Sequence, residues 1–187
     1  MKFAQEFQVG RPLPEVWALF QDVPAVAQCM PGAELTADKG GGVFAGLVSV
    51  KLGPLNPTFE GEATAIYDDA AKEIQLTGSG VDRTGGSRGR VNVEVGLRDV
   101  ESATVVAVDA NITLSGAASR FGRTGLMEEM ANRLINEFVA CLEAKLAAGT
   151  EAEAASVQAR EVRGLSLFLS SIAGWLSRLF RRLFGTK

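Results

Sequence analysis

The sequence predicts an α+β fold, in which one antiparallel sheet is followed by a long helix. Two observations predict it: several runs alternate apolar and polar residues between turn residues, and a final stretch has apolar residues at helical spacing. Strands that come in sequence before a terminal helix are typical of α+β domains. With 187 residues, 47% of them hydrophobic, the chain can form one domain of about 150 residues plus an extension.

The expected elements begin with one strand and two short helices. Residues 3–9 alternate with period two and predict the strand. Residues 12–20 predict a helix because Pro12 suits its first turn and four apolar residues share a face. A second short helix passes Cys29 and ends at Pro31-Gly32.

About six antiparallel strands are then expected. The glycines of residues 39–42 predict a hairpin turn, and strand-like runs follow at 43–52, 58–67, 73–77, 90–97 and 104–114. Residues 78–89 are rich in glycine and predict a loop. The long helix is expected over residues 121–148, where apolar residues recur from Leu126 to Leu146.

The composition excludes several kinds of chemistry. Without any histidine, the chain lacks the commonest general base and the usual zinc ligand. We therefore expect no catalytic residues and no metal site. The body is acidic and has no basic–aromatic pattern, so nucleic acid is not an expected partner.

The two cysteines, Cys29 and Cys141, have no motif spacing and are expected to be separate buried thiols. Isolated cysteines fit a reducing cytoplasm, and the first residues have no secretion signal.

The C-terminal residues differ in charge from the rest. Residues 160–187 carry a net charge of +5, whereas the whole chain carries −3. We divide the chain into a domain at residues 1–148, a linker at 149–164 and an amphipathic helix at 165–187. The helix has one apolar face beside a cluster of arginines, and its membrane-binding residues are expected to be Leu165, Phe168, Leu169, Ile172, Trp175, Leu176, Arg178, Leu179, Phe180, Arg181, Arg182, Leu183 and Phe184.

This tail is predicted to lie on a membrane surface. Its uncharged stretch, residues 165–177, has 13 residues, fewer than the roughly 20 that span a bilayer. An interfacial position buries its aromatic and aliphatic side chains while its arginines face anionic lipid headgroups. The alternative is that the apolar face packs on the domain or on another protein.

Four sequence blocks carry a resemblance to a known family. They are CMPGA at residues 29–33, KLGP at 51–54, SRFGR at 119–123 and NEF at 136–138. In this order they resemble the CoxG family of carbon monoxide dehydrogenase subunits, part of the START-like (SRPBCC) superfamily of hydrophobic-ligand-binding domains. The resemblance covers about residues 1–148. It implies a helix-grip fold, in which a curved antiparallel sheet wraps around the C-terminal helix and leaves an apolar cavity.

The resemblance also implies a function. It implies a non-enzymatic accessory protein of a molybdenum-containing CO dehydrogenase or related hydroxylase, at the cytoplasmic face of the cell membrane. The roles proposed for such proteins are recruitment of the enzyme to the membrane and handling of its quinone acceptor. The expected ligand is a respiratory quinone (menaquinone or ubiquinone), bound without a covalent link. The alternative is a recruitment adaptor with no carrier role.

The residues themselves also favour a cavity. Met127 and Met130 suit an irregular apolar pocket, and Gly46 and Gly61 leave room in the strands. Pro31 and Phe121 are expected near the two ends of the groove along the long helix. The predicted ligand-binding residues are Met30, Pro31, Phe44, Val48, Val50, Leu52, Phe59, Ala63, Val93, Val95, Phe121, Leu126, Met127, Met130 and Leu134.

Overall fold

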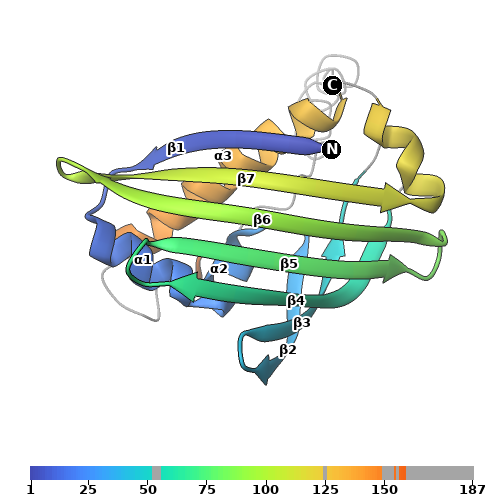
Figure 1. Ribbon diagram of the computed structural model, residues 1–187, viewed down its shortest axis with the longest axis horizontal. Helices are drawn as coiled ribbons and strands as arrows, with labels where there is room; N and C mark the ends of the chain where they lie inside the picture. Colours follow the sequence, from blue (N-terminus) through green and yellow to red (C-terminus); the bar gives the residue numbers. More distant parts are fainter. Residues whose placement is uncertain (52–55, 124–125, 149–153, 155, 159–187) are drawn as a thin grey trace, which may run out of the picture.

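The computed structural model describes residues 1–51, 56–123, 126–148, 154 and 156–158 (Figure 1). Its strands form one antiparallel sheet in the order β1-β7-β6-β5-β4-β3-β2. The elements follow in chain order: β1 (Lys2–Val9), α1 (Leu13–Gln21), α2 (Val23–Cys29), β2 (Ala33–Gly40), β3 (Val43–Ser49), β4 (Thr58–Asp68), β5 (Glu73–Asp82), β6 (Ser87–Val100), β7 (Ala103–Ser115), the 3-10 helix η1 (Gly116–Arg123) and α3 (Leu126–Ala147).

This architecture confirms the predicted α+β fold. One strand, two short helices, six further strands and a terminal helix occur in the expected order. In Figure 1, β5, β6 and β7 run side by side, whereas β2 and β3 turn steeply away from them, so the sheet is curved. The predicted tail helix at residues 165–187 lies outside the described residues.

Two element boundaries differ from the prediction. The expected loop at residues 78–89 is wrong, because β5 continues to Asp82 and β6 begins at Ser87. Pairing with the neighbouring strands outweighs the low strand propensity of glycine here. The long helix begins at Leu126 rather than at residue 121, and residues 116–123 form η1 instead. Glycines at 116 and 122 disfavour an α-helix in this segment.

The cysteines are not separate thiols. Cys29 of α2 and Cys141 of α3 form a disulfide with an S–S distance of 2.09 Å. Both are buried, as expected, but the prediction that they stand alone is wrong. They are 112 residues apart, so only the folded arrangement of α2 against α3 brings them together. The argument from isolated cysteines to a reducing compartment therefore loses its premise.

The buried core lies toward one end of the sheet. There, α1 and the C-terminal half of α3 pack against Val9, Ile74, Leu97 and Val106 of four strands. The ring of Phe138 on α3 meets those of Phe7 and Phe20 edge-on, with centroids 6.4 and 6.2 Å apart.

Residues just beyond α3 also contact the domain. Lys145 donates to the carbonyl oxygen of Ala154 over 2.8 Å, and Val157 packs against the core cluster. Ala154 and Val157 both belong to the predicted linker.

Candidate ligand-binding face

A row of four glycines crosses the inner face of the sheet, away from the buried core. The strand register pairs Gly46 of β3 with Gly61 of β4, Gly61 with Gly80 of β5, and Gly80 with Gly89 of β6. Strands lie about 4.8 Å apart, so the row is a strip about 14 Å long without side chains. This strip makes the inner face hollow at that end.

Close backbone contacts require glycine at two of these positions. A Cβ atom on Gly61 would lie 1.9 Å from the carbonyl oxygen of Ser79, and one on Gly46 would lie 2.6 Å from that of Glu34. Both contacts are far inside van der Waals separation, so any larger residue would force the strands apart. The hollow and the sheet's bend therefore depend on the same glycines.

Apolar side chains border the glycine row. Phe59 of β4 lies beside it: its Cβ would be 3.1 Å from a Cβ on Gly80, and its ring 3.6 Å from one on Gly89. The next row toward the core pairs Phe44 with Ala63, Ala63 with Gly78, and Gly78 with Val91. Small and apolar residues thus line this end of the inner face.

Six of the predicted pocket residues lie on this inner face. The period of two and the strand register place Phe44, Val48, Phe59, Ala63, Val93 and Val95 on the same side as the glycine row. Val95 packs against the buried core, so it lies farther from the glycines than the other five. Val48, paired with Phe59, is 42% exposed.

Four more predicted pocket residues lie at the edge of the sheet or on α3. Met30 ends α2 and is 39% exposed, and Pro31 follows it, half-buried. Leu134 is half-buried on α3, one turn before Phe138. Val50 follows β3, and its N–H donates to the carbonyl oxygen of Pro57. Leu52 and the side chains of Phe121, Leu126, Met127 and Met130 lie outside the described part.

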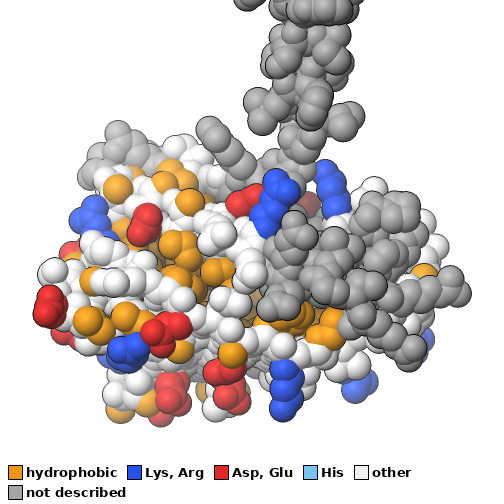
Figure 2. Space-filling model, turned by 90° about the horizontal axis from the view of Figure 1, so that it is seen from above, with side chains coloured by type: hydrophobic (Ala, Val, Ile, Leu, Met, Phe, Trp, Pro, Cys, Tyr) orange, Lys and Arg blue, Asp and Glu red, His pale blue; other side chains and the backbone are white. Residues whose placement is uncertain are grey.

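A second hollow lies between β1 and α3, and the sequence analysis did not predict it. This open groove has a volume of about 570 Å³. Figure 2 views the molecule from above, where hydrophobic side chains gather in the middle of the face with charged ones around them. None of the predicted pocket residues lines the groove. Its lining residues are Gln5, Glu6, Phe7, Asn132, Ile135, Asn136, Val139, Ala140 and Glu143.

The groove residues follow two regular spacings. On β1 the half-buried Gln5 and Phe7 alternate with exposed residues, and on α3 Asn132, Ile135 and Val139 recur every three or four positions. These spacings were visible in the sequence. The missing information was that the first strand lies next to the last helix.

The inner face offers few polar groups to a ligand. The Tyr67 hydroxyl donates to the carbonyl oxygen of Phe20 over 3.3 Å, and burial raises the pKa of this phenol above its ordinary value of 10.0. Across the described ranges we find no cluster of metal-binding side chains and no helix long and apolar enough to cross a bilayer.

The fold is similar to several solved structures. A conserved protein from Geobacillus kaustophilus superposes with a TM-score of 0.67 at 13% identity, covering 79% of this chain and 95% of that one. The ZhuI aromatase/cyclase from Streptomyces sp. R1128 has a TM-score of 0.55 at 17% identity, covering 80% and 98%. TTHA0849 from Thermus thermophilus has a TM-score of 0.51 at 16% identity, covering 82% and 97%. At these identities the likeness concerns the fold alone.

Sequence comparison identifies the family. No curated protein sequence matches the chain. The family model of the carbon monoxide dehydrogenase subunit CoxG, by its name an accessory component of that enzyme, matches residues 6–147. That match spans β1 to the end of α3 and includes the glycine row. The chain therefore belongs to the CoxG family of carbon monoxide dehydrogenase subunits.

Proposed function

We propose that this protein is a membrane-associated accessory protein that binds a respiratory quinone beneath its curved sheet. In this role it links a molybdenum-containing CO dehydrogenase, or a related hydroxylase, to the membrane quinone pool. The row formed by Gly46, Gly61, Gly80 and Gly89 is the observation that carries the proposal. A strip about 14 Å long without side chains, bordered by Phe44 and Phe59, suits a flat apolar ligand.

The C-terminal sequence supports the membrane part of the proposal. Residues 165–187 combine one apolar face with arginines at 178, 181 and 182. Such a segment binds an anionic surface through its apolar area and through each cation near the headgroups. A domain held at the surface would be within reach of a ligand that is dissolved in the bilayer.

A binding role fits the face better than catalysis does. The chain has no histidine, and the hydroxyl of Tyr67 already donates to a backbone carbonyl. The aromatase/cyclase among the similar structures shares the fold, and fold alone does not imply activity.

The test of ligand binding is to extract freshly purified full-length protein with organic solvent and analyse the extract by mass spectrometry. We expect a quinone in amounts approaching one per chain. In Ala63→Trp the indole would fill the hollow beside Gly78, so the quinone should be lost. Thr77→Trp is the matched control because Thr77 is exposed on the outer face of β5. Wild-type protein without quinone, or equal loss in both variants, would contradict the carrier role.

The second candidate is a recruitment adaptor that only tethers the dehydrogenase. Both roles predict that deletion of residues 165–187 releases the protein from vesicles that contain anionic lipid. They differ in Ala63→Trp. An adaptor with this substitution still recruits the dehydrogenase and supports electron transfer to quinone, whereas a carrier with it recruits the enzyme but does not support that transfer.

A further inference from the structure

Glu137 of α3 has one carboxylate oxygen without a hydrogen-bond partner. Its Oε1 atom accepts a hydrogen bond from Nε of Arg133 over 3.2 Å. Its Oε2 atom is buried and finds no donor within the described part of the chain. A buried acceptor without a partner costs about 1–3 kcal/mol, and more when it is charged. Such a group is retained when something else supplies the donor.

Glu137 lies on the flank of α3 that faces α2. It is one turn before Cys141, which is bonded to Cys29 of α2. At 100° per residue it is about 40° from Cys141 and about 60° from Leu134 around the helix axis. The groove residues Ile135 and Val139 point toward β1, on the opposite flank. Glu137 therefore belongs to the inner side of the helix, next to the predicted pocket residue Leu134, and not to the groove.

The chemistry of a carboxylate limits what can pair with this oxygen. A carboxylate accepts hydrogen bonds and donates none, so its partner must carry an O–H or N–H group. The two carbonyl oxygens of a quinone only accept, whereas the two hydroxyls of its reduced form, the hydroquinone, donate. Of the two redox forms, only the hydroquinone can satisfy the free oxygen of Glu137.

We propose that Glu137 selects the ligand by accepting a hydrogen bond from a ring hydroxyl, so that the protein binds a hydroquinone in preference to the quinone. This inference rests on the proposed ligand-binding role and names the redox form that the same face holds. The ring would lie between α3 and the glycine row, with one hydroxyl toward Glu137. Its apolar tail would lie along the strip that the glycines leave open.

The test compares three probes that differ only at the ring oxygens: a short-chain alkyl hydroquinone, its quinone and its dimethyl ether. Their dissociation constants are measured on the full-length protein under anaerobic conditions. We expect the hydroquinone to bind about tenfold or more tightly than the dimethyl ether, as for a hydrogen bond to a charged group. Equal affinities of the wild-type protein for the hydroquinone and the ether would overturn the inference without the need for any variant.

Two variants of Glu137 sharpen the test. Glu137→Leu should reduce the difference between hydroquinone and ether to about twofold or less, since the acceptor is gone. Glu137→Gln supplies an amide N–H and should improve binding of the quinone relative to wild type. Glu143→Leu, on the exposed side of the same helix, is the control and should keep the wild-type preference. A Glu137→Leu protein that is folded by circular dichroism and keeps the full preference would overturn the inference.

The outcomes also separate this inference from the proposed function. If none of the three probes binds, the ligand-binding role fails and the selection fails with it. If all three bind with equal affinity, the ligand-binding role stands and only the assignment of Glu137 is wrong.

Discussion

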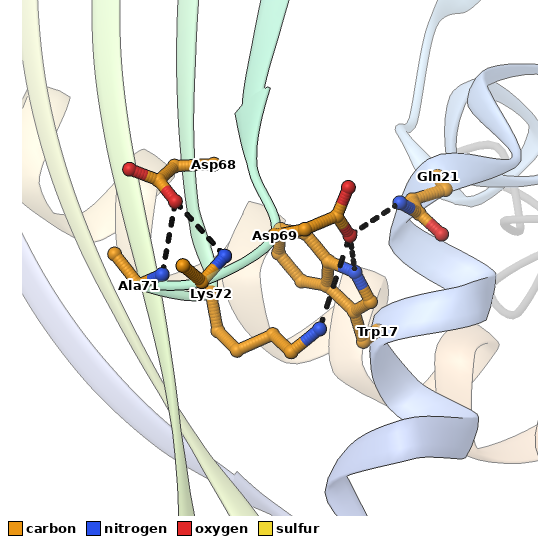
Figure 3. A network of polar contacts seen from close by, with 7 residues as sticks. Trp17, Gln21, Asp68, Asp69, Ala71 and Lys72 are labelled. Atoms are coloured by element: carbon orange, nitrogen blue, oxygen red, sulfur yellow. Dashed lines mark hydrogen bonds and ion pairs between the residues drawn. The ribbon is translucent and has the colours of Figure 1, made fainter.

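The indole nitrogen of Trp17 donates a hydrogen bond to Oδ1 of Asp69 over 2.8 Å and so fastens α1 to the turn between β4 and β5 (Figure 3). The same oxygen accepts from Nε2 of Gln21 over 3.1 Å. The Lys72 ammonium lies 3.8 Å from that oxygen and 4.7 Å from the centre of the Trp17 ring. One carboxylate thus joins the first helix to the far end of the sheet.

Asp69→Ala should destabilise the protein by about 1–2 kcal/mol. The substitution leaves the N–H of a Trp17 side chain that is 5% exposed without its partner. Asp69 itself is largely exposed, so water can replace part of the lost interaction, which keeps the cost toward the lower end. Urea unfolding followed by circular dichroism measures the change. Asp109→Ala, on the outer face of β7, is the control and should change the unfolding free energy by less than about 0.5 kcal/mol.

Gly61→Ala should cost at least about 2 kcal/mol, because its Cβ would lie 1.9 Å from the carbonyl oxygen of Ser79 and the backbone must shift. Gly96→Ala in β6 is the matched control, since a Cβ there meets nothing within 4 Å. We expect that variant to be neutral or slightly more stable, as the unfolded chain loses freedom. Urea unfolding of both variants measures the difference. Equal effects would mean that the close approach of β4 and β5 does not constrain the sheet.

The strands and their inner face could be predicted because alternation is a local signal. Residues that alternate in one strand lie on one face whatever the topology, so Phe59 and Ala63, or Val93 and Val95, were correctly placed together. The number and order of strands followed from the turn residues between them.

The pairing of distant residues could not be predicted in this way. The glycine row needs Gly46, Gly61, Gly80 and Gly89 in one register, and register is set by contacts between strands rather than within them. The glycine-rich segment between β5 and β6 therefore resembled a loop. The groove beside β1 was missed for the same reason, because it forms where the first strand meets the last helix.

Removing the disulfide with Cys29→Ala and Cys141→Ala should destabilise the protein by about 2–5 kcal/mol. The bond closes a loop of 112 residues between α2 and α3, so it restricts the unfolded chain strongly. Urea unfolding of the double variant against the oxidised wild-type protein measures the loss. A mass measurement after thiol alkylation of the unfolded, unreduced protein gives the covalent state. Two alkylated cysteines in freshly purified protein would contradict the disulfide.

The stability of the protein should rise with pH over a window that Lys145 defines. Its ammonium group donates to Oε1 of Gln28 and to the carbonyl oxygen of Ala154, both over 2.8 Å, and it is 5% exposed. Burial lowers the pKa of Lys145 below its ordinary value of 10.5, and the charge of Asp22 offsets this only in part. Between the lowered pKa and about 10.5 the unfolded chain holds a proton that the folded protein has released, so unfolding becomes less favourable as pH rises.

Lys145→Met should remove this rise, and the measurement is the unfolding free energy from pH 7 to 11. Tyr67 acts in the opposite direction. Its pKa is raised by burial, so above pH 10 the unfolded chain loses a proton that the folded protein keeps, and stability falls. Tyr67→Phe should therefore remove the fall at high pH and leave the contribution of Lys145 in place. If Lys145→Met has the same slope as the wild-type protein between neutral pH and 10, the lysine is not desolvated in solution, and the contact between Ala154 and α3 is not maintained.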